Sequence, residues 1–374
     1  MTTEQLPPTY QVPLDKVEAL RRDTADLFAV TFTALDQPQP GYVTFHGRFL
    51  QDSAACFDDL RGRFEQHGFT PLVRQKEDGR LTLIALPHVF NPPASRWIIN
   101  LLLFLATIAS TLWVGASYEL GLEVPWQEMW RGWPFSLSLL LILGAHELGH
   151  YFAARYHKVP VTLPYFIPLP GSFSLIGTLG AFIQLKAPVK NKRALFDVGA
   201  AGPLAGMVFA IPILLFGLAT SPVHALPASG YLAEGNSILY LAAKFLVFGK
   251  ILPSGGQDVL LNQVAWAGWV GLLVTGLNLI PVGQLDGGHV AYVLFGKRAR
   301  QLYWPVLASL VILVIFTGAT MWVLWIGLLF FLGRVYAEPL DDVTPLDGRR
   351  RALAIFTLVL FVLVFMPVPF QIVN

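Results

Sequence analysis

The sequence predicts a polytopic α-helical membrane protein with about seven transmembrane helices, a membrane-associated β-hairpin and a small N-terminal α+β soluble domain. Hydrophobic residues make up 54% of the 374 residues and charged residues only 13%, whereas a soluble domain carries about 25%. After residue 96, apolar runs long enough to cross a bilayer alternate with connections that hold clusters of Lys and Arg. The net charge of +2 gives no reason to expect a nucleic-acid partner, and the single cysteine, Cys56, excludes a cysteine-based metal site.

Residues 1–93 are expected to form the soluble domain. Its elements follow from the spacing of apolar residues, with helices at 15–27 and 52–67 and strands at 28–35, 41–50, 72–75 and 81–86. No motif for catalysis or metal binding occurs in this segment, so we place the chemistry in the rest of the chain.

The rest of the chain is expected to cross the membrane seven times. The predicted spans are 97–116, 135–156, 197–219, 259–280, 302–318, 321–335 and 352–370. Asp197 is expected to cap the third span. Residues 237–249 are apolar but short and interrupted by Lys244, so either an interfacial or a re-entrant helix fits them.

The basic clusters give the predicted orientation. They lie at 155–158, 186–193, 297–300 and 349–351, and all fall on one side of the membrane if the chain crosses seven times. Because Lys and Arg concentrate on the cytoplasmic side, we predict a multi-pass protein of the cell membrane with a cytoplasmic N-terminus and a C-terminus outside.

The connection between the second and third spans is unlike the others. Four prolines between 160 and 170 forbid a helix, and residues 174–186 are rich in glycine, β-branched and aromatic residues, as in a hairpin or strand pair. Such backbone is tolerated at membrane depth only where protein or water covers it. Its edge either pairs with an unwound substrate segment or is a structural flap. The residues at that edge are Ile176, Gly177, Thr178, Leu179 and Gly180.

The second span carries the sequence His146-Glu-Leu-Gly-His150. Two histidines four residues apart lie on one face of a helix, where they can bind one metal ion, and Glu147 beside them can act on a water. An ionisable residue within an apolar span costs at least ~2.5 kcal/mol on insertion scales, so it marks function.

Two histidines do not complete a catalytic zinc site, which usually has three protein ligands. Asp286 is the candidate third ligand, because the predicted topology brings it to the same depth as His146 and His150. Asn278, buried in the same span, either donates to an oxyanion or forms an interhelical hydrogen bond. His289 is expected to be an interface side chain and not a fourth ligand.

These residues predict the hydrolysis of a peptide bond. One Zn²⁺ per chain, held by His146, His150 and Asp286, would activate a water, with Glu147 as general base and Asn278 as oxyanion donor. A metal transporter is disfavoured because the outer halves of the spans are apolar. An inactive relative that acts as a chaperone is disfavoured because Glu147 and the ligands are all present.

The paired motifs resemble the site-2 protease family of intramembrane zinc metalloproteases, peptidase family M50. The resemblance is carried by the His146 motif and by Asn278-x-x-Pro-x-x-x-x-Asp286-Gly. It implies cleavage within or next to transmembrane segments of single-span membrane proteins, with both His and the Asp on zinc and Glu147 catalytic. The loop 221–258 is too short for the PDZ domain of many relatives, so the chain resembles a PDZ-less branch with an N-terminal cytoplasmic domain.

The resulting domain plan has four parts. They are the soluble domain 1–93, a first span and outer loop at 94–134, a metalloprotease core at 135–290, and three C-terminal spans at 291–374. The lipid bilayer and the substrate are the expected partners, and the oligomeric state is left open.

Overall fold

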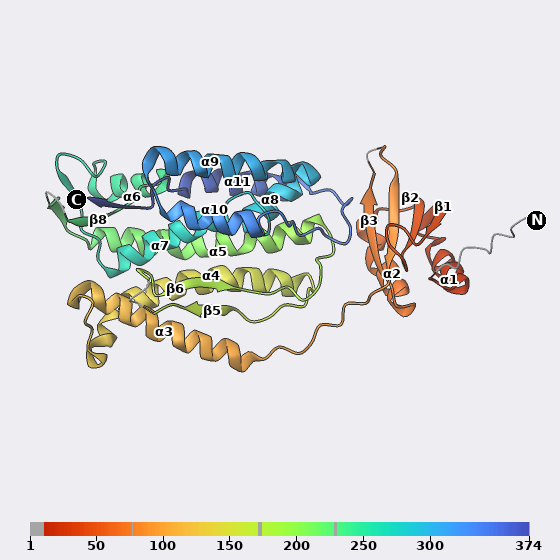
Figure 1. The fold of residues 1–374 in the computed structure, drawn as a ribbon, viewed down its shortest axis with the longest axis horizontal. Helices are drawn as coiled ribbons and strands as arrows, with labels where there is room; N and C mark the ends of the chain where they lie inside the picture. The colour runs from red at the N-terminus through yellow and green to blue at the C-terminus, as the bar shows by residue number, and fades with distance from the viewer. Residues whose placement is uncertain (1–10, 77, 171–173, 228–229, 374) are drawn as a thin grey trace, which may run out of the picture. The chain divides into compact units, whose positions relative to one another are not determined.

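The structure, a computed structural model, describes residues 11–76, 78–170, 174–227 and 230–373, and the chain divides into two compact units (Figure 1). Unit 1 contains Met1–Pro93 together with two short segments from later in the chain, Lys186–Leu195 and Glu338–Leu346. Unit 2 contains the remaining residues, including nearly all of the helical part.

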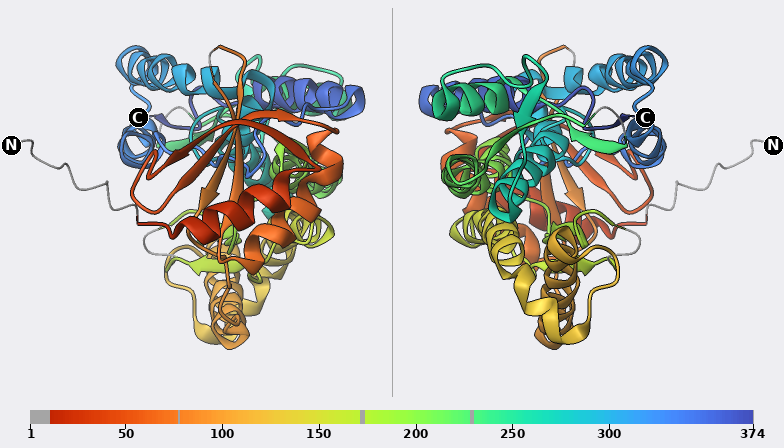
Figure 2. Two further views of the ribbon diagram at one scale, coloured as in Figure 1. Left: turned by 90° about the vertical axis from the view of Figure 1, so that its right-hand side faces the viewer. Right: turned by 90° about the vertical axis from the view of Figure 1, so that its left-hand side faces the viewer.

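Unit 1 is a four-stranded antiparallel sheet with the order β1-β2-β4-β3, and Figure 2 shows its two helices on the same face of that sheet. Phe57 of one helix and Phe45 and Leu83 of the sheet are fully buried in its core. The predicted order of elements is confirmed. Their bounds are α1 Leu14–Thr24, β1 Phe28–Leu35, β2 Val43–Phe49, α2 Ser53–Gln66, β3 Thr70–Gln75 and β4 Leu81–Leu86.

The outer edge of β3 is paired within unit 1, which the sequence did not predict. The Val73 N–H donates to the Leu340 carbonyl at 2.8 Å, and the Leu340 N–H donates to the Val189 carbonyl at 2.9 Å. Lys190 forms an ion pair of 2.7 Å with Asp58. Two inter-helix connections therefore extend the sheet, and they satisfy backbone groups that an edge strand would leave open.

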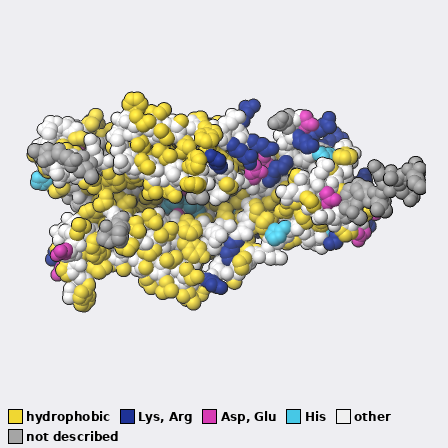
Figure 3. All heavy atoms as spheres, in the orientation of Figure 1, with side chains coloured by type: hydrophobic (Ala, Val, Ile, Leu, Met, Phe, Trp, Pro, Cys, Tyr) yellow, Lys and Arg dark blue, Asp and Glu magenta, His cyan; other side chains and the backbone are white. Residues whose placement is uncertain are grey.

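Unit 2 is built mainly of helices that run side by side (Figure 1). Its helices include α3 Trp97–Leu120, α4 Trp133–Tyr156, α5 Lys192–Ala219 (in unit 2 from Phe196), α7 Gln263–Asn278, α8 Asp286–Phe295, α9 Tyr303–Thr317, α10 Met321–Leu332 and α11 Gly348–Val364. The face of this unit seen in Figure 3 is mostly hydrophobic, with few charged side chains along the helices.

Within the described residues, four helical stretches are long and apolar enough to cross a membrane. They are Trp97–Leu120, Trp126–Tyr156, Lys192–Ala219 and Asp286–Thr317. The helices α7, α10 and α11 have 16, 12 and 17 residues, so their length alone does not identify them as membrane spans. The short apolar segment predicted at 237–249 forms α6 (Ile238–Phe248), an 11-residue helix that ends at Gly249 in the left-handed conformation.

Three expectations about element bounds are wrong. Asp197 does not cap α5, because the helix begins at Lys192, and the Asn191 side chain accepts from the Ala194 N–H instead. The strand pair was expected within residues 174–186, but β6 (Thr178–Phe182) pairs with β5 (Tyr165–Pro168) instead. The proline-rich stretch supplies this partner because proline is tolerated in an edge strand. The last predicted span is too long. Its helix α11 ends at Val364, shortly before Pro367, and Phe370–Val373 forms β10, which pairs with β8 (Tyr231–Glu234).

Glycines bring α5 and α7 into close contact. A Cβ added at Gly268 of α7 would lie 2.6 Å from the Leu214 Cα of α5, and a Cβ at Gly217 of α5 would overlap the Ala265 backbone of α7. This contact fixes α7 against α5, so it also fixes the far end of α7, where Asn278 lies.

We expect Gly268→Ala to destabilise unit 2 by about 1–3 kcal/mol, because the added methyl group has no space. The thermal transition of the detergent-purified protein measures the loss. Gly327→Ala in α10 is the matched control, since nothing lies within 4 Å of its added Cβ. An equal transition temperature for both variants would contradict the close contact.

Candidate metal centre

The helix α4 places His146, Glu147 and His150 inside unit 2. Their exposed fractions are 3%, 5% and 7%, so none of these polar groups is left to bulk solvent. Because the two histidines are separated by one helical turn, their rings lie together, with centroids 4.8 Å apart. Glu147, one residue later than His146, starts at a different angle around the helix.

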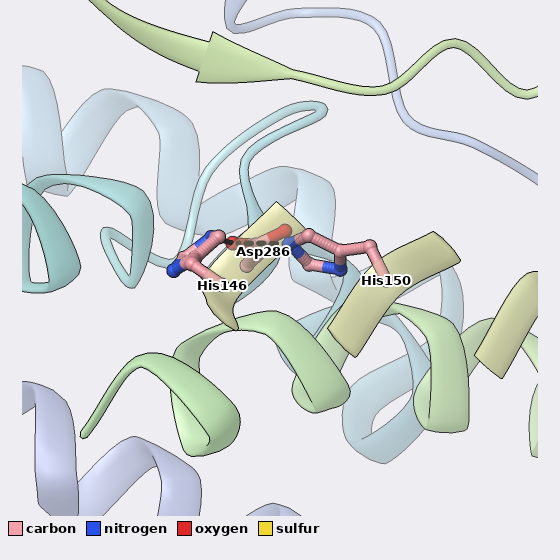
Figure 4. Close-up of side chains that lie close together, drawn as sticks. All are labelled: His146, His150 and Asp286. Atoms are coloured by element: carbon pink, nitrogen blue, oxygen red, sulfur yellow. Dashed lines mark hydrogen bonds and ion pairs between the residues drawn. The ribbon is translucent and has the colours of Figure 1, made fainter. Parts of the chain in front are cut away.

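Asp286 reaches the two imidazoles from a separate helix, as Figure 4 shows. It is the first residue of α8, and its Oδ2 lies 3.2 Å from the His146 Nε2 and 3.3 Å from the His150 Nε2. Gly287 allows this position, because a Cβ there would overlap the carbonyl oxygen of Leu279. The predicted convergence of three residues from two distant stretches is therefore present.

The three donors fit a zinc ion in spacing and chemistry. They all lie within 4.8 Å of one another. Ligand atoms at ~2.0–2.1 Å from a tetrahedral zinc are separated by roughly 3.3 Å, close to the two nitrogen–oxygen distances above. Two imidazoles and one carboxylate also form a typical catalytic donor set, which keeps a fourth position open.

A backbone carbonyl of α5 orients His150. The His150 Nδ1 lies 2.6 Å from the Val198 carbonyl oxygen, which can only accept, so Nδ1 carries the hydrogen and donates. Its Nε2 is then left with a lone pair for a metal. Sequence reasoning missed Val198, because a backbone acceptor has no side-chain signature.

Glycines of α5 make room for the histidines. A Cβ at Gly202 would overlap the His150 Nε2, and one at Gly206 would lie 3.3 Å from the His146 Cβ. A third, Gly199, faces His289, with 2.8 Å between an added Cβ and the His289 Cβ. The glycines at 199, 202 and 206 could have predicted this close packing from the sequence, because their spacing puts them on one helix face.

The other predicted residues lie around the three donors. The Asn278 amide nitrogen is 3.4 Å from the His146 Nε2. The Ile183 backbone N–H, just after β6, lies beside the Glu147 carboxylate. Thr178, Leu179 and Gly180 lie in β6, whereas Ile176 and Gly177 precede it. His289 is not part of the three-residue group.

Comparisons with known proteins agree with these motifs. The family model described as Peptidase family M50 matches residues 134–321. The Probable zinc metalloprotease EGY2, chloroplastic, of Arabidopsis thaliana is 29% identical over 98% of the chain and 67% of its own length. The Probable zinc metalloprotease EGY1, chloroplastic, of the same plant is 30% identical over 74% of the chain and 54% of its own length. No solved structure matches the chain.

We expect Gly202→Ala to lower zinc affinity about 10–100-fold, the usual effect of disturbing the surroundings of a metal ligand, because the methyl group displaces His150. The zinc content of the purified protein after dialysis measures this. Gly144→Ala in α4 is the control, because its added Cβ meets nothing within 4 Å. Full zinc content in the Gly202 variant would show that His150 need not occupy this position to bind metal.

Proposed function

The chain belongs to peptidase family M50 and is a zinc metalloendopeptidase, and we propose that it hydrolyses peptide bonds within or next to transmembrane segments of single-span membrane proteins. The family resemblance drawn from the motifs is confirmed. The observation that carries the proposal is the convergence of His146, His150 and Asp286 from α4 and α8 inside an apolar helical unit.

We assign zinc to His146, His150 and Asp286. When bound there, zinc supplies Lewis-acid activation of water and polarisation of the scissile carbonyl. Glu147 takes the proton of the attacking water and passes it to the leaving amine. Its carboxylate is suited to this because it is buried next to both histidines and is not one of the three donors.

Asn278 donates to the carbonyl oxygen of the scissile bond in this proposal. Its amide nitrogen lies beside His146 Nε2, so it faces the same space as the three donors. An amide donor aimed at the developing oxyanion stabilises the transition state more than the substrate.

The edge of β6 holds the substrate in an extended form. Leu179 is 66% exposed, and an added Cβ at Gly180 meets nothing within 4 Å, so a second strand has room to pair there. We assign Thr178, Leu179 and Gly180 to this pairing, in which the substrate backbone replaces the Thr178 hydroxyl that now bonds the Gly180 N–H and carbonyl. Ile176 and Gly177 anchor the strand, since the Gly177 carbonyl already accepts from Ser110 and Leu169.

A membrane location follows from the four long apolar stretches and the family. We propose that α7, α10 and α11 also cross, which gives seven spans, a cytoplasmic N-terminus and a C-terminus outside in a cell membrane. The basic clusters support this orientation. The relatives are described as chloroplastic, whereas we propose a cell membrane for this chain. The domain plan with a soluble segment 1–93 and a core at 135–290 belongs to the same proposal.

We expect Glu147→Gln to retain zinc and to cleave a single-span model substrate at least ~100-fold more slowly, because the proton acceptor is lost. Zinc analysis and quantified cleavage measure the two effects. Glu123→Gln, in an exposed loop, is the control. Equal cleavage by both variants would remove Glu147 from the mechanism.

We expect Asp286→Asn to weaken zinc retention about 10-fold or more, because the amide replaces an anionic ligand. Competition with a zinc-binding dye gives the affinity. Unchanged zinc occupancy would mean that another residue is the third ligand.

A further inference from the structure

A cavity of about 440 Å³ with several polar groups in its wall lies in unit 2, and none of the three metal donors lines it. Its walls include Tyr118 near the end of α3, Trp266 in the first turn of α7, and Glu234, Asn236 and Asp258 from the segments between α5 and α7. Trp266 precedes Asn278 along α7 by roughly 18 Å at 1.5 Å per residue. The cavity is therefore at one end of α7 and the metal donors are at the other.

The cavity has an excess of negative charge. Lys244, fully buried, lies 3.3 Å from the Asp258 Oδ1 and 3.9 Å from the Glu234 Oε1. One ammonium group therefore faces two carboxylates. Burial raises the pKa of the Glu234 carboxyl, while Lys244 acts in the opposite direction. Because burial disfavours the charged form of a carboxyl group that lacks a cation, a second cation in the cavity would hold both carboxylates in their charged form.

The second oxygen of each carboxylate is available for that cation. Within the described part of the chain, the bonds that other residues make to Glu234 use Oε1, and those to Asp258 use Oδ1. Both side chains line the cavity, so an ammonium or guanidinium group inside it can reach them.

The same cavity contains one acceptor and one donor that lack a well-aligned partner. The Asn236 Oδ1 and the Trp266 Nε1 are buried, and among the described residues neither makes a hydrogen bond of good geometry. The Tyr118 hydroxyl lies beside the Trp266 Nε1. Both residues line the cavity, and Trp266 is only 8% exposed. Buried polar groups are normally satisfied. A backbone amide supplies the missing donor and the missing acceptor together.

Tyr118 connects the cavity to the β5–β6 hairpin. Its hydroxyl donates to the Leu175 carbonyl at 2.7 Å, three residues before β6 begins. The other end of β6 is next to Ile183 and Glu147. A polypeptide that follows the β6 edge away from Glu147 therefore runs toward the cavity wall.

We propose that this cavity is a substrate subsite for a lysine or arginine side chain, whose cation binds between Glu234 and Asp258 while the adjacent backbone amide pairs with Asn236 and Trp266. The proposal rests on the proposed proteolysis, since the polypeptide is the substrate. At ~3.3 Å per extended residue, the ~18 Å along α7 places the basic residue about five or six positions from the scissile bond.

The test uses full-length protein carrying Glu147→Gln, so that the substrate stays intact during the measurement. The probes are fluorescent single-span model substrates with blocked termini. Each carries either one Lys or one Gln at a chosen position, from three to ten residues from the cut site. Mass spectrometry of the products made by the active enzyme locates that cut site. We expect Lys to bind about 10-fold more tightly than Gln near position five or six, the size of one charge-assisted contact.

In Glu234→Gln and in Asp258→Asn the preference for Lys should fall below about twofold, because one carboxylate charge is removed. The affinity for the Gln substrate should stay unchanged and serves as the check on folding, and Glu123→Gln should keep the full preference. Equal affinity for Lys and Gln at every position, or a preference kept in both variants, would overturn the proposal. If no substrate is cut, the positions are counted along the sequence of the model substrate. A preference for Lys that falls in both carboxylate variants then supports the subsite, while the proposed proteolysis fails.

Discussion

The close approach of α4 to α5 is the contact on which the metal centre depends. Two imidazoles inside an apolar helical unit need space and polar partners, and α5 provides both. Gly202 and Gly206 leave room for the rings, and the Val198 carbonyl holds one of them in a fixed tautomer. Gly149 of α4 packs on the Ala201 backbone in return. A side chain in place of any of these glycines would push α4 and α5 apart and would move the two histidines out of their positions.

Asp197 keeps α5 in this position. Its carboxylate binds His157 at the end of α4 at 2.8 Å and Arg350 at the start of α11 at 2.7 Å. One residue later comes Val198, the acceptor for His150. The Asp197 carboxylate thus joins three helices next to the carbonyl that orients a metal donor, a larger role than the helix cap expected from the sequence.

Much of the centre could be predicted because ionisable residues are costly within apolar spans. His146, Glu147, His150 and Asp286 were therefore visible as a group before any geometry was known. The elements of residues 14–86 also followed from spacing alone. Contacts made by backbone atoms could not be read in this way. Val198, the β5 partner of β6 and the pairing of Val73 with Leu340 depend on where the chain returns in space.

The most direct test of the account is an experimental structure of the zinc-loaded protein with the ion located by anomalous scattering. The account predicts one zinc, with the His146 Nε2, the His150 Nε2 and an Asp286 carboxylate oxygen each at ~2.0–2.2 Å. A zinc ion bound by the histidines with Asp286 more than ~5 Å away, beyond any coordination distance, would contradict it.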